Sequence, residues 1–391
     1  MKKKIIRITT VPGSLGVLLD GQLKYMSQFY EIIGISSAGK PPLSLEKVGQ
    51  KENIRVIPVE MSRRITFFKD LKGIFQLCRI FWKEKPDMVH THTPKAGLLG
   101  MIAAYITRVP HRLHTVAGMP LLEATGKKRN LLDLVEKVTY FCATHVYPNS
   151  FGLQEIILAN QYAPQKKVKV IGHGSSNGID TSYFDPTLFD VQDKATLAQS
   201  LNISNDDFVF VFVGRLVKDK GINELIAAFT ELSKENHNIV LLLVGGFEAE
   251  LDPLLPETLA LMDANKKIVS VGWQNDVRPY LAMADSMVFP SYREGFPNAV
   301  LQSAAMGLPS IVSDINGCNE IVKNHVNGII VAPKNTEQLK NAMASLLNNR
   351  DTVQLNSGEI RKQIQDHYKR QVIWENILEE YNQLLLSSNT P

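Results

Sequence analysis

The chain has 391 residues, of which 44% are hydrophobic and 21% charged, a composition typical of a globular protein with room for two domains. No apolar run approaches the roughly 20 residues that span a bilayer, and the first residues pass directly into a strand-like pattern, so we expect neither a membrane span nor a signal peptide. Three widely spaced cysteines indicate neither a disulfide framework nor a zinc cluster, which favours a reducing cytoplasm.

The net charge of +4 conceals an asymmetry between the two halves of the chain. Residues 1–190 carry 26 Lys and Arg against 15 Asp and Glu, a net charge of +11, whereas the remainder carries 17 against 24, or −7. A basic first half indicates an acidic partner, such as nucleic acid, a phosphorylated small molecule or an anionic membrane surface. Nucleic acid ranks last because the basic and aromatic stripe of nucleic-acid modules is missing. The alternative is that these charges are merely solvated.

Alternating strands and helices fill the first half, as in a parallel α/β sheet. The expected strands are residues 4–10, 32–36, 54–58, 87–90, 112–116, 145–148 and 168–171, and the expected helices are residues 16–29, 65–83, 94–106, 130–144 and 151–160. The loop expected at residues 11–15 places Gly13 and Gly16 between a strand and a helix, which is an anion-binding arrangement. Their spacing matches neither the dinucleotide fingerprint nor the phosphate loop, and a plain tight turn remains the alternative.

The helix expected at residues 65–83 combines aromatic with basic side chains. These are Phe67, Phe68, Phe75, Phe81 and Trp82, with Lys69, Lys72, Arg79 and Lys83. One face should pack on the sheet, and the surplus aromatic and cationic side chains can rest on anionic lipid. The alternative is a core helix with a solvated basic side, because a helix that flanks a sheet needs a broad apolar stripe in any case.

The loop after the strand at residues 87–90 contains His92 and precedes Lys95. Loops at the carboxyl ends of parallel strands bind ligands in open α/β sheets. No cluster of carboxylates joins the neighbouring histidines, so we expect no metal site. We expect His92, Thr93 or Lys95 to form hydrogen bonds with a ligand instead.

The second half repeats the alternation after a stretch rich in turn-forming residues at 172–186. The expected strands are residues 208–213, 239–244, 267–271, 286–289, 310–313 and 328–331, and the expected helices are residues 222–232, 256–263, 276–283, 299–306, 337–347, 351–368 and 371–386. Arg215 follows the first of these strands, where its guanidinium can fork onto phosphate oxygens, and Lys220 adds a point charge at the next helix entrance. A solvated basic turn is the alternative.

The stretch SYREGFPNAVLQSAAMGLP, residues 291–309, follows a buried strand and leads into a helix with Pro297 in its first turn. The free N–H groups around Gly295 and Phe296 favour an anionic ligand, yet Glu294 lies directly beside them. A carboxylate there would repel a bare phosphate, so we expect Glu294 to face hydroxyl groups of the ligand. An ordinary joint with a solvated Glu is the alternative.

These motifs in this order resemble family 4 of the retaining nucleotide-sugar glycosyltransferases, which have the GT-B fold. They are Gly13 with Gly16, Gly214–Arg215 with Lys220, and REGFPNAVLQ at residues 293–302. The likeness covers nearly the whole chain and is strongest over residues 208–331. HTHTPKAGLLG and GSSNGID are similar to a branch that builds bacterial capsule, O-antigen or related polysaccharides.

The resemblance implies an α/β protein with two Rossmann-like domains facing across a cleft. Residues 1–175 would form the acceptor domain, 176–206 a linker, 207–370 the nucleotide-sugar domain, and 371–391 a C-terminal helix that returns to the first domain. It implies catalytic roles for Arg215 and Lys220 on the diphosphate and for Glu294 on the donor sugar, without a metal or other cofactor. The implied donor-binding residues are Gly214, Gly245, Gly295, Phe296, Pro297, Asn298 and Gln302. Those implied for the acceptor or phosphate loop are Gly13, Gly16, His92 and Lys95.

Two positions depart from the family pattern. The second acidic residue of the motif is Gln302 here, which offers the ribose one acceptor oxygen plus donors. Many relatives carry a histidine where this chain has Ala117, so no catalytic base is assigned.

The resemblance implies a retaining glycosyltransferase that uses a nucleoside-diphosphate sugar, UDP-linked by expectation. Its partners would be a polyprenyl-diphosphate-linked sugar acceptor and the anionic inner face of the cytoplasmic membrane, with no nucleic acid. The expected location is cytoplasmic or peripheral on that face. The alternatives are a nucleotide-sugar epimerase or hydrolase of the same fold, and an inactive nucleotide-sugar-binding subunit.

Overall fold

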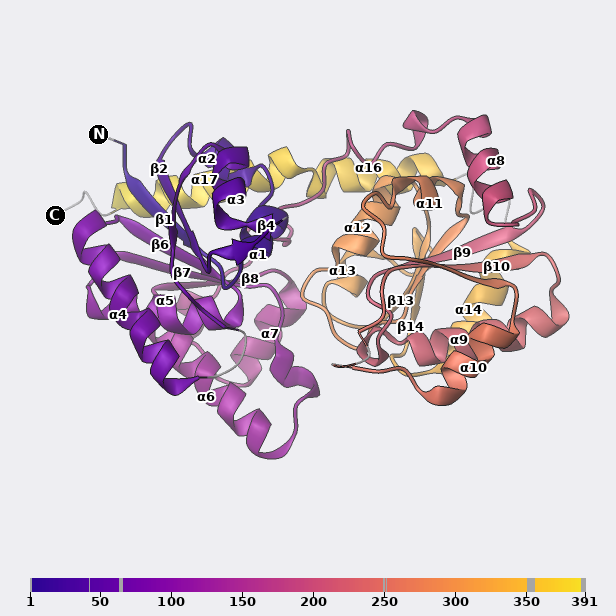
Figure 1. Ribbon diagram of the computed structural model, residues 1–391, viewed down its shortest axis with the longest axis horizontal. Helices are drawn as coiled ribbons and strands as arrows, with labels where there is room; N and C mark the ends of the chain where they lie inside the picture. The colour runs from indigo at the N-terminus through magenta and orange to yellow at the C-terminus, as the bar shows by residue number, and fades with distance from the viewer. Residues whose placement is uncertain are drawn as a thin grey trace. The chain divides into compact units, whose positions relative to one another are not determined.

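The computed structural model describes residues 2–41, 43–62, 66–248, 250, 252–349 and 356–387. The chain divides into two compact units, one of Met1–Asn177 with Arg370–Pro391 and the other of Gly178–Lys369 (Figure 1). The start of the helix expected at residues 65–83 and the first five residues of the one expected at 351–368 lie outside the described residues.

The first unit is built on a six-stranded parallel sheet in the order β5-β2-β1-β6-β7-β8. Its strands are β1 Lys4–Ile8, β2 Glu31–Ser36, β5 Arg55–Pro58, β6 Met88–His92, β7 His111–Val116 and β8 His145–Pro148. Its helices are α1 Pro12–Leu18, α2 Gln22–Met26, α3 Leu45–Glu52, α4 Phe67–Glu84, α5 Pro94–Ile106, α6 Gly126–Cys142, α7 Phe151–Ala159 and α17 Arg370–Ser387. A small antiparallel pair, β3 Gly39–Lys40 and β4 Leu43–Ser44, precedes α3.

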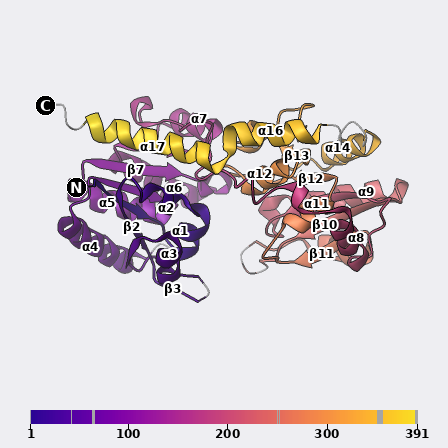
Figure 2. The same ribbon diagram turned by 90° about the horizontal axis from the view of Figure 1, so that it is seen from above.

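The two faces of this sheet bury separate apolar cores. Strand alternation sends Ile6 and Ile8 to the face covered by α4, α5, α6 and α7, and sends Ile5 to the opposite face. There α17 packs with α1, α2 and α3 (Figure 2). Its Tyr381 is completely buried. Tyr381 Oη also contacts His90 Nδ1 at 2.5 Å. The last helix of the chain therefore completes the core of the first unit.

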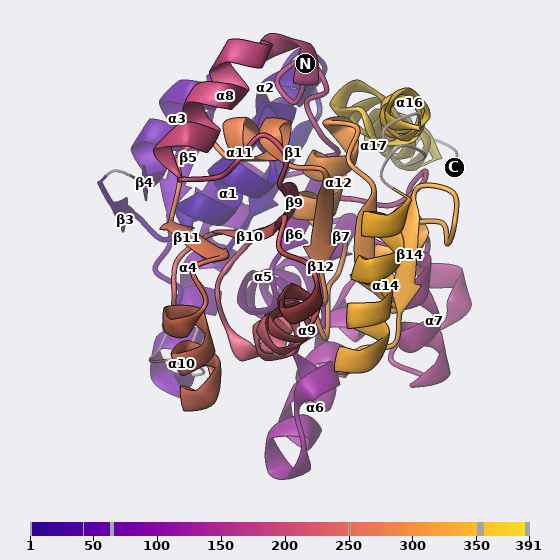
Figure 3. The ribbon, with the colours of Figure 1, turned by 90° about the vertical axis from the view of Figure 1, so that its right-hand side faces the viewer.

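The second unit has the same construction, with a parallel sheet in the order β11-β10-β9-β12-β13-β14. Its strands are β9 Phe208–Val213, β10 Ile239–Val244, β11 Ile268–Gly272, β12 Ser286–Phe289, β13 Ser310–Ser313 and β14 Gly328–Val331. Its helices are α8 Val191–Ser200, α9 Ile222–Glu235, α10 Pro256–Ala264, α11 Arg278–Met283, α12 Asn298–Ala305, α13 Cys318–Ile321, α14 Thr336–Asn348 and α16 Ser357–Tyr368. Helices α9 and α14 lie side by side on one face (Figure 3).

Close approach of two backbones explains the glycines after β9 and β10. A Cβ at Gly245 would lie 1.7 Å from the carbonyl oxygen of Gly214, so no other residue fits without moving the chain. The first turns after these two central strands are thereby pressed together at the carboxyl edge of the sheet. This is the edge at which open α/β sheets bind ligands.

Several local predictions from the sequence are wrong. Helix α1 begins at Pro12, and the backbone turns at Gly21 with a φ of 76° before α2, so residues 16–29 are not one helix. Proline suits the first turn of a helix, which is why the expected loop at residues 11–15 is helical instead. Strand β6 extends to His92, which pairs with Thr115 of β7, so His92 is not in a loop. The strand expected at residues 168–171 is only an isolated bridge from Val168 to Val146, and helices α3 and α8 were not expected.

We predict that acid destabilises the first unit through its buried histidines. Burial lowers the pKa of His114 to about 4, whereas the unfolded chain titrates near 6.5. The unfolded state therefore takes up the proton first, and stability falls as pH drops from 6.5 towards 4. From pH 7 to pH 5 this histidine alone should cost about 2 kcal/mol.

Fluorescence-monitored urea unfolding in a Trp273→Phe background measures this effect. Trp82 and Trp374, the two remaining tryptophans, both belong to the first unit. His114→Gln should flatten the pH dependence by the stated amount. An unchanged slope would show that other groups control acid stability.

Candidate active site

The two central loops of the second unit bring together the cation and the carboxylate singled out in the sequence. Lys220 lies at the end of the 3₁₀ turn Lys218–Lys220, after β9, and Glu294 lies after β12. Lys220 Nζ contacts Glu294 Oε1 in an ion pair whose side chains are each 15% exposed. Ser291 Oγ donates to the same carboxylate oxygen at 2.9 Å. The sequence places these residues 74 positions apart, and the parallel sheet makes them neighbours.

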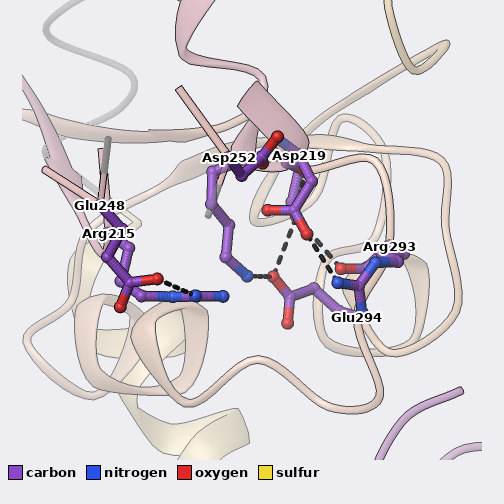
Figure 4. Close-up of polar contacts among 8 residues, drawn as sticks. Arg215, Asp219, Glu248, Asp252, Arg293 and Glu294 are labelled. Atoms are coloured by element: carbon purple, nitrogen blue, oxygen red, sulfur yellow. Dashed lines mark hydrogen bonds and ion pairs between the residues drawn. The ribbon is translucent and has the colours of Figure 1, made fainter. Parts of the chain in front are cut away.

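Arg215 also pairs with a carboxylate at this edge. Its Nη1 lies 2.6 Å from Oε2 of Glu248, which follows β10, and the guanidinium is half exposed (Figure 4). Lys220 and Arg215 are therefore both neutralised by an acidic partner in the structure. An anionic ligand that binds either cation has to compete with Glu294 or Glu248.

The loop between Glu294 and α12 is fixed from two sides. Asn316 Nδ2 donates to the carbonyl oxygen of Glu294, and Gly317 packs so closely that a Cβ there would lie 2.5 Å from the oxygen of Gly295. Phe296 is 9% exposed, and its ring centroid lies 5.3 Å from that of Tyr368. Phe296 thus anchors the loop in the core with its side chain, which leaves its backbone as the group available to a ligand.

Pro297 lies just before α12 rather than in its first turn, because the helix begins at Asn298. Gln302 lies one turn further along the same helix face and is partly buried. Gly295, Pro297, Asn298 and Gln302 therefore form one continuous segment behind Glu294. Gly214 and Gly245 belong to the neighbouring turns described above.

The candidate ligand-binding residues of the first unit do not form a single cluster of side chains that are available to a ligand. Gly13 and Gly16 lie within α1, and a Cβ at Gly16 would meet Val48 Cγ2 of α3 at 2.8 Å. Close packing of two helices is thus sufficient reason for Gly16. Lys95 is 9% exposed, and its Nζ lies 2.6 Å from Asp70 Oδ2.

The His92 side chain is buried and forms a hydrogen bond with Arg7. Its Nε2 accepts from Arg7 Nη2 at 2.9 Å, and Arg7, which is fully buried, also donates to Gln22 Oε1 at 2.6 Å. Burial, followed by the charges of Arg7 and His114, holds the pKa of His92 well below its usual value. His92 is therefore a neutral acceptor in the structure.

Four charged residues at the edge of the second sheet were not identified as candidates from the sequence: Asp219, Glu248, Asp252 and Arg293. Asp219 and Arg293 flank the two residues that were recognised, and that adjacency was the only available signal. These four residues form their contacts between loops that follow different strands, and the sequence alone does not show which loops meet at the sheet edge.

Two further features of the described chain bear on its chemistry. Within the ranges that the structure covers, no three His, Cys, Asp or Glu residues gather in a way that could hold a metal ion. None of the helices described is both long and apolar enough to cross a membrane.

Comparison with known proteins gives two family matches. Residues 193–366 match the family described as glycosyl transferases group 1, and residues 35–174 match the glycosyl transferase 4-like domain. The capsular polysaccharide biosynthesis glycosyltransferase CapM of Staphylococcus aureus is 33% identical over 387 residues, which is 99% of this chain and 98% of that protein. The Escherichia coli UDP-Gal:alpha-D-GlcNAc-diphosphoundecaprenol alpha-1,3-galactosyltransferase is 35% identical over 292 residues, 72% of each chain.

Solved structures show the same architecture at lower identity. Anabaena HepE in complex with UDP matches with a TM-score of 0.80 at 18% identity, covering 98% of this chain and 100% of that one. WaaG, a glycosyltransferase involved in lipopolysaccharide biosynthesis, matches with a TM-score of 0.70 at 14% identity, covering 95% and 98%. The chain therefore belongs to the group 1 glycosyltransferases and has the GT-B fold.

Proposed function

We propose that the protein is a retaining, metal-independent glycosyltransferase that moves a sugar from a UDP-sugar to a lipid-linked sugar acceptor in the assembly of a bacterial surface polysaccharide. The observation that carries the proposal is the Lys220–Glu294 pair beside Arg215, all on loops at one sheet edge of a group 1 glycosyltransferase. Support for UDP and for a diphosphoundecaprenol-linked acceptor comes from the name of the E. coli relative. Support for a capsular product comes from the name of CapM.

The charges suit departure of a nucleoside diphosphate. As the bond from the sugar to the diphosphate breaks, negative charge builds on the phosphate, and Arg215 and Lys220 stabilise it. Glu294, released from Lys220 by the donor, binds sugar hydroxyls as an acceptor. The acceptor hydroxyl forms the new bond to the sugar and passes its proton to the leaving phosphate, so no protein nucleophile is needed. Gln302 contacts the ribose through its amide.

For the acceptor we propose the first unit, with Gly13, Gly16, His92 and Lys95 as candidate residues. To bind a ligand, His92 and Lys95 have to give up their contacts with Arg7 and Asp70. Helix α4 supports a lipid-linked acceptor, because it exposes Phe67 by 70%, Phe68 by 85%, Phe75 by 65% and Trp82 by 58%. Phe81, in contrast, is buried in the core. The exposed basic residues Lys69, Lys72, Arg79 and Lys83 share this helix.

An exposed aromatic face with adjoining cations suits the surface of an anionic bilayer. Lys69 and Lys72 also line a pocket beside α4, where the carboxylates of Glu60 and Asp70 balance their charge. We therefore propose that α4 rests on the inner face of the cytoplasmic membrane and that the protein is peripheral there.

The proposed role of Arg215 predicts that Arg215→Ala lowers kcat/KM about 100-fold, the usual cost of losing one contact to a charge that develops in the transition state. The assay follows release of nucleoside diphosphate from the UDP-sugar that the wild-type protein turns over fastest in a panel. Lys234→Ala is the control, because it removes an exposed lysine of the same unit that pairs with Glu231. Wild-type turnover by Arg215→Ala would contradict the mechanism.

Competition between Glu248 and the diphosphate for Arg215 predicts that Glu248→Gln tightens binding of UDP about 2- to 5-fold, the worth of one exposed ion pair. Isothermal titration calorimetry measures the change. The matched control is Glu231→Gln, which opens the exposed pair with Lys234 and should leave the Kd unchanged. Weaker binding by Glu248→Gln would show that Glu248 itself contacts the nucleotide.

Membrane contact through α4 predicts that the protein floats with vesicles of anionic phospholipid at low salt and is released at high salt. Phe68→Ser with Phe75→Ser should lower the bound fraction severalfold, since both rings are largely exposed and contribute little to folding. Leu188→Ser, at an exposed apolar position of the second unit, is the control. Equal flotation of both variants would exclude α4 as the contact.

A further inference from the structure

The turn that carries Lys220 depends on contacts from other segments. It has three residues, Lys218–Lys220, and among the described residues its N-cap Val217 makes no side-chain capping bond. Gly221 follows so close to Pro290 that a Cβ there would lie 2.1 Å from the Pro290 carbonyl oxygen. Such a short turn cannot hold a flexible lysine in place by its own hydrogen bonds.

Several hydrogen bonds from neighbouring loops converge on Asp219, the residue before Lys220. Asp252 Oδ2 accepts from the Asp219 N–H at 2.7 Å, and the Tyr292 N–H donates to the Asp219 carbonyl oxygen at 2.9 Å. Arg293 Nη2 donates to Asp219 Oδ2 at 2.7 Å (Figure 4). The main chain and the carboxylate of one residue are thus held by the loops after β10 and β12.

Two consecutive residues pair with two consecutive residues of opposite charge. Asp219 and Lys220 on one loop face Arg293 and Glu294 on the other, and we call the two ion pairs, Asp219–Arg293 and Lys220–Glu294, the ion-pair ladder. Binding of a donor diphosphate has to open the Lys220–Glu294 pair. The Asp219–Arg293 pair involves no group assigned to the donor, so it can stay closed and keep the two loops in register.

We propose that Asp219 and Arg293 are positioning residues that hold Lys220 in place for the departing diphosphate. This inference rests on the proposed function, because it assumes that Lys220 binds the diphosphate. Arg293 has a second effect, since it neutralises a carboxylate beside a site for anions. The Asp219 Oδ1 atom is inaccessible and has no hydrogen-bond partner among the described residues, so Arg293 is the main compensation for this charge.

The test uses steady-state kinetics of UDP-sugar turnover with Arg293→Gln, Arg293→Lys and Arg293→Gln combined with Asp219→Asn. Arg293→Gln should lower kcat about 10-fold, in the range that a small misplacement of a catalytic group produces, with a smaller change in KM. Arg293→Lys should recover most of kcat because it restores the charge. Asp219→Asn should recover part of it by removing the uncompensated carboxylate.

A merely structural role is excluded by two further readouts. The double variant Arg293→Gln with Asp219→Asn removes the partly exposed pair, with side chains 32% and 21% accessible, without leaving an unpaired carboxylate, so its thermal unfolding midpoint should stay close to that of the wild type. In a Lys220→Ala background Arg293→Gln should cause no further loss of kcat, because the residue that it positions is gone. Lys362→Gln, which opens the exposed pair with Asp366, is the control and should leave kcat unchanged.

The outcomes separate the two proposals. If Lys220→Ala lowers kcat and Arg293→Gln lowers it further by the same factor in both backgrounds, the positioning role is wrong while the proposed function stands. Wild-type kcat in Arg293→Gln would also overturn the positioning role alone. Wild-type kcat in Lys220→Ala would overturn the proposed function, and with it the positioning role.

Discussion

The ion pair between one ammonium and one carboxylate, on loops that follow the central strands of the second sheet, is the interaction on which the rest of the site depends. Lys220 and Glu294 meet because β9 and β12 are neighbouring parallel strands whose carboxyl ends open at the same edge. Close packing at Gly221 and Gly317 brings the loops into contact. The charges are thereby held partly out of water, where they act more strongly on each other and on a ligand.

Every cation identified at this edge has an acidic partner. Lys220 contacts Glu294, Arg215 contacts Glu248, and Arg293 contacts Asp219. Pairing reduces the self-repulsion of a cluster of positive charges and orients each side chain before a ligand arrives. An anionic ligand that binds these cations has to replace their carboxylate contacts with its own charged oxygens, so the net charge that it meets is smaller than a count of basic residues suggests.

Continuous apolar runs made the central strands predictable, and Phe208–Val213 is found where it was expected because a buried parallel strand needs such a run. The family and the fold were also recognisable from short motifs. The beginning of α1 was missed because Pro12 was assigned to a loop instead of a first helical turn. Contacts between distant residues, such as those of Arg7 with His92 and of Arg215 with Glu248, could not be inferred, since they depend on how loops and strands pack.

The packing of α17 imposes an order on biosynthesis. Ile373, Ile377, Tyr381 and Leu385 pack on one face of the first sheet, yet they are translated about 225 to 240 residues after the last strand of that sheet, β8. At the 5–20 residues per second of translation, that face stays uncovered for roughly 11–48 seconds until α17 is made. The first half of the chain therefore emerges from the ribosome with part of its apolar core still exposed, and the second unit, whose residues are contiguous, is the first able to fold completely.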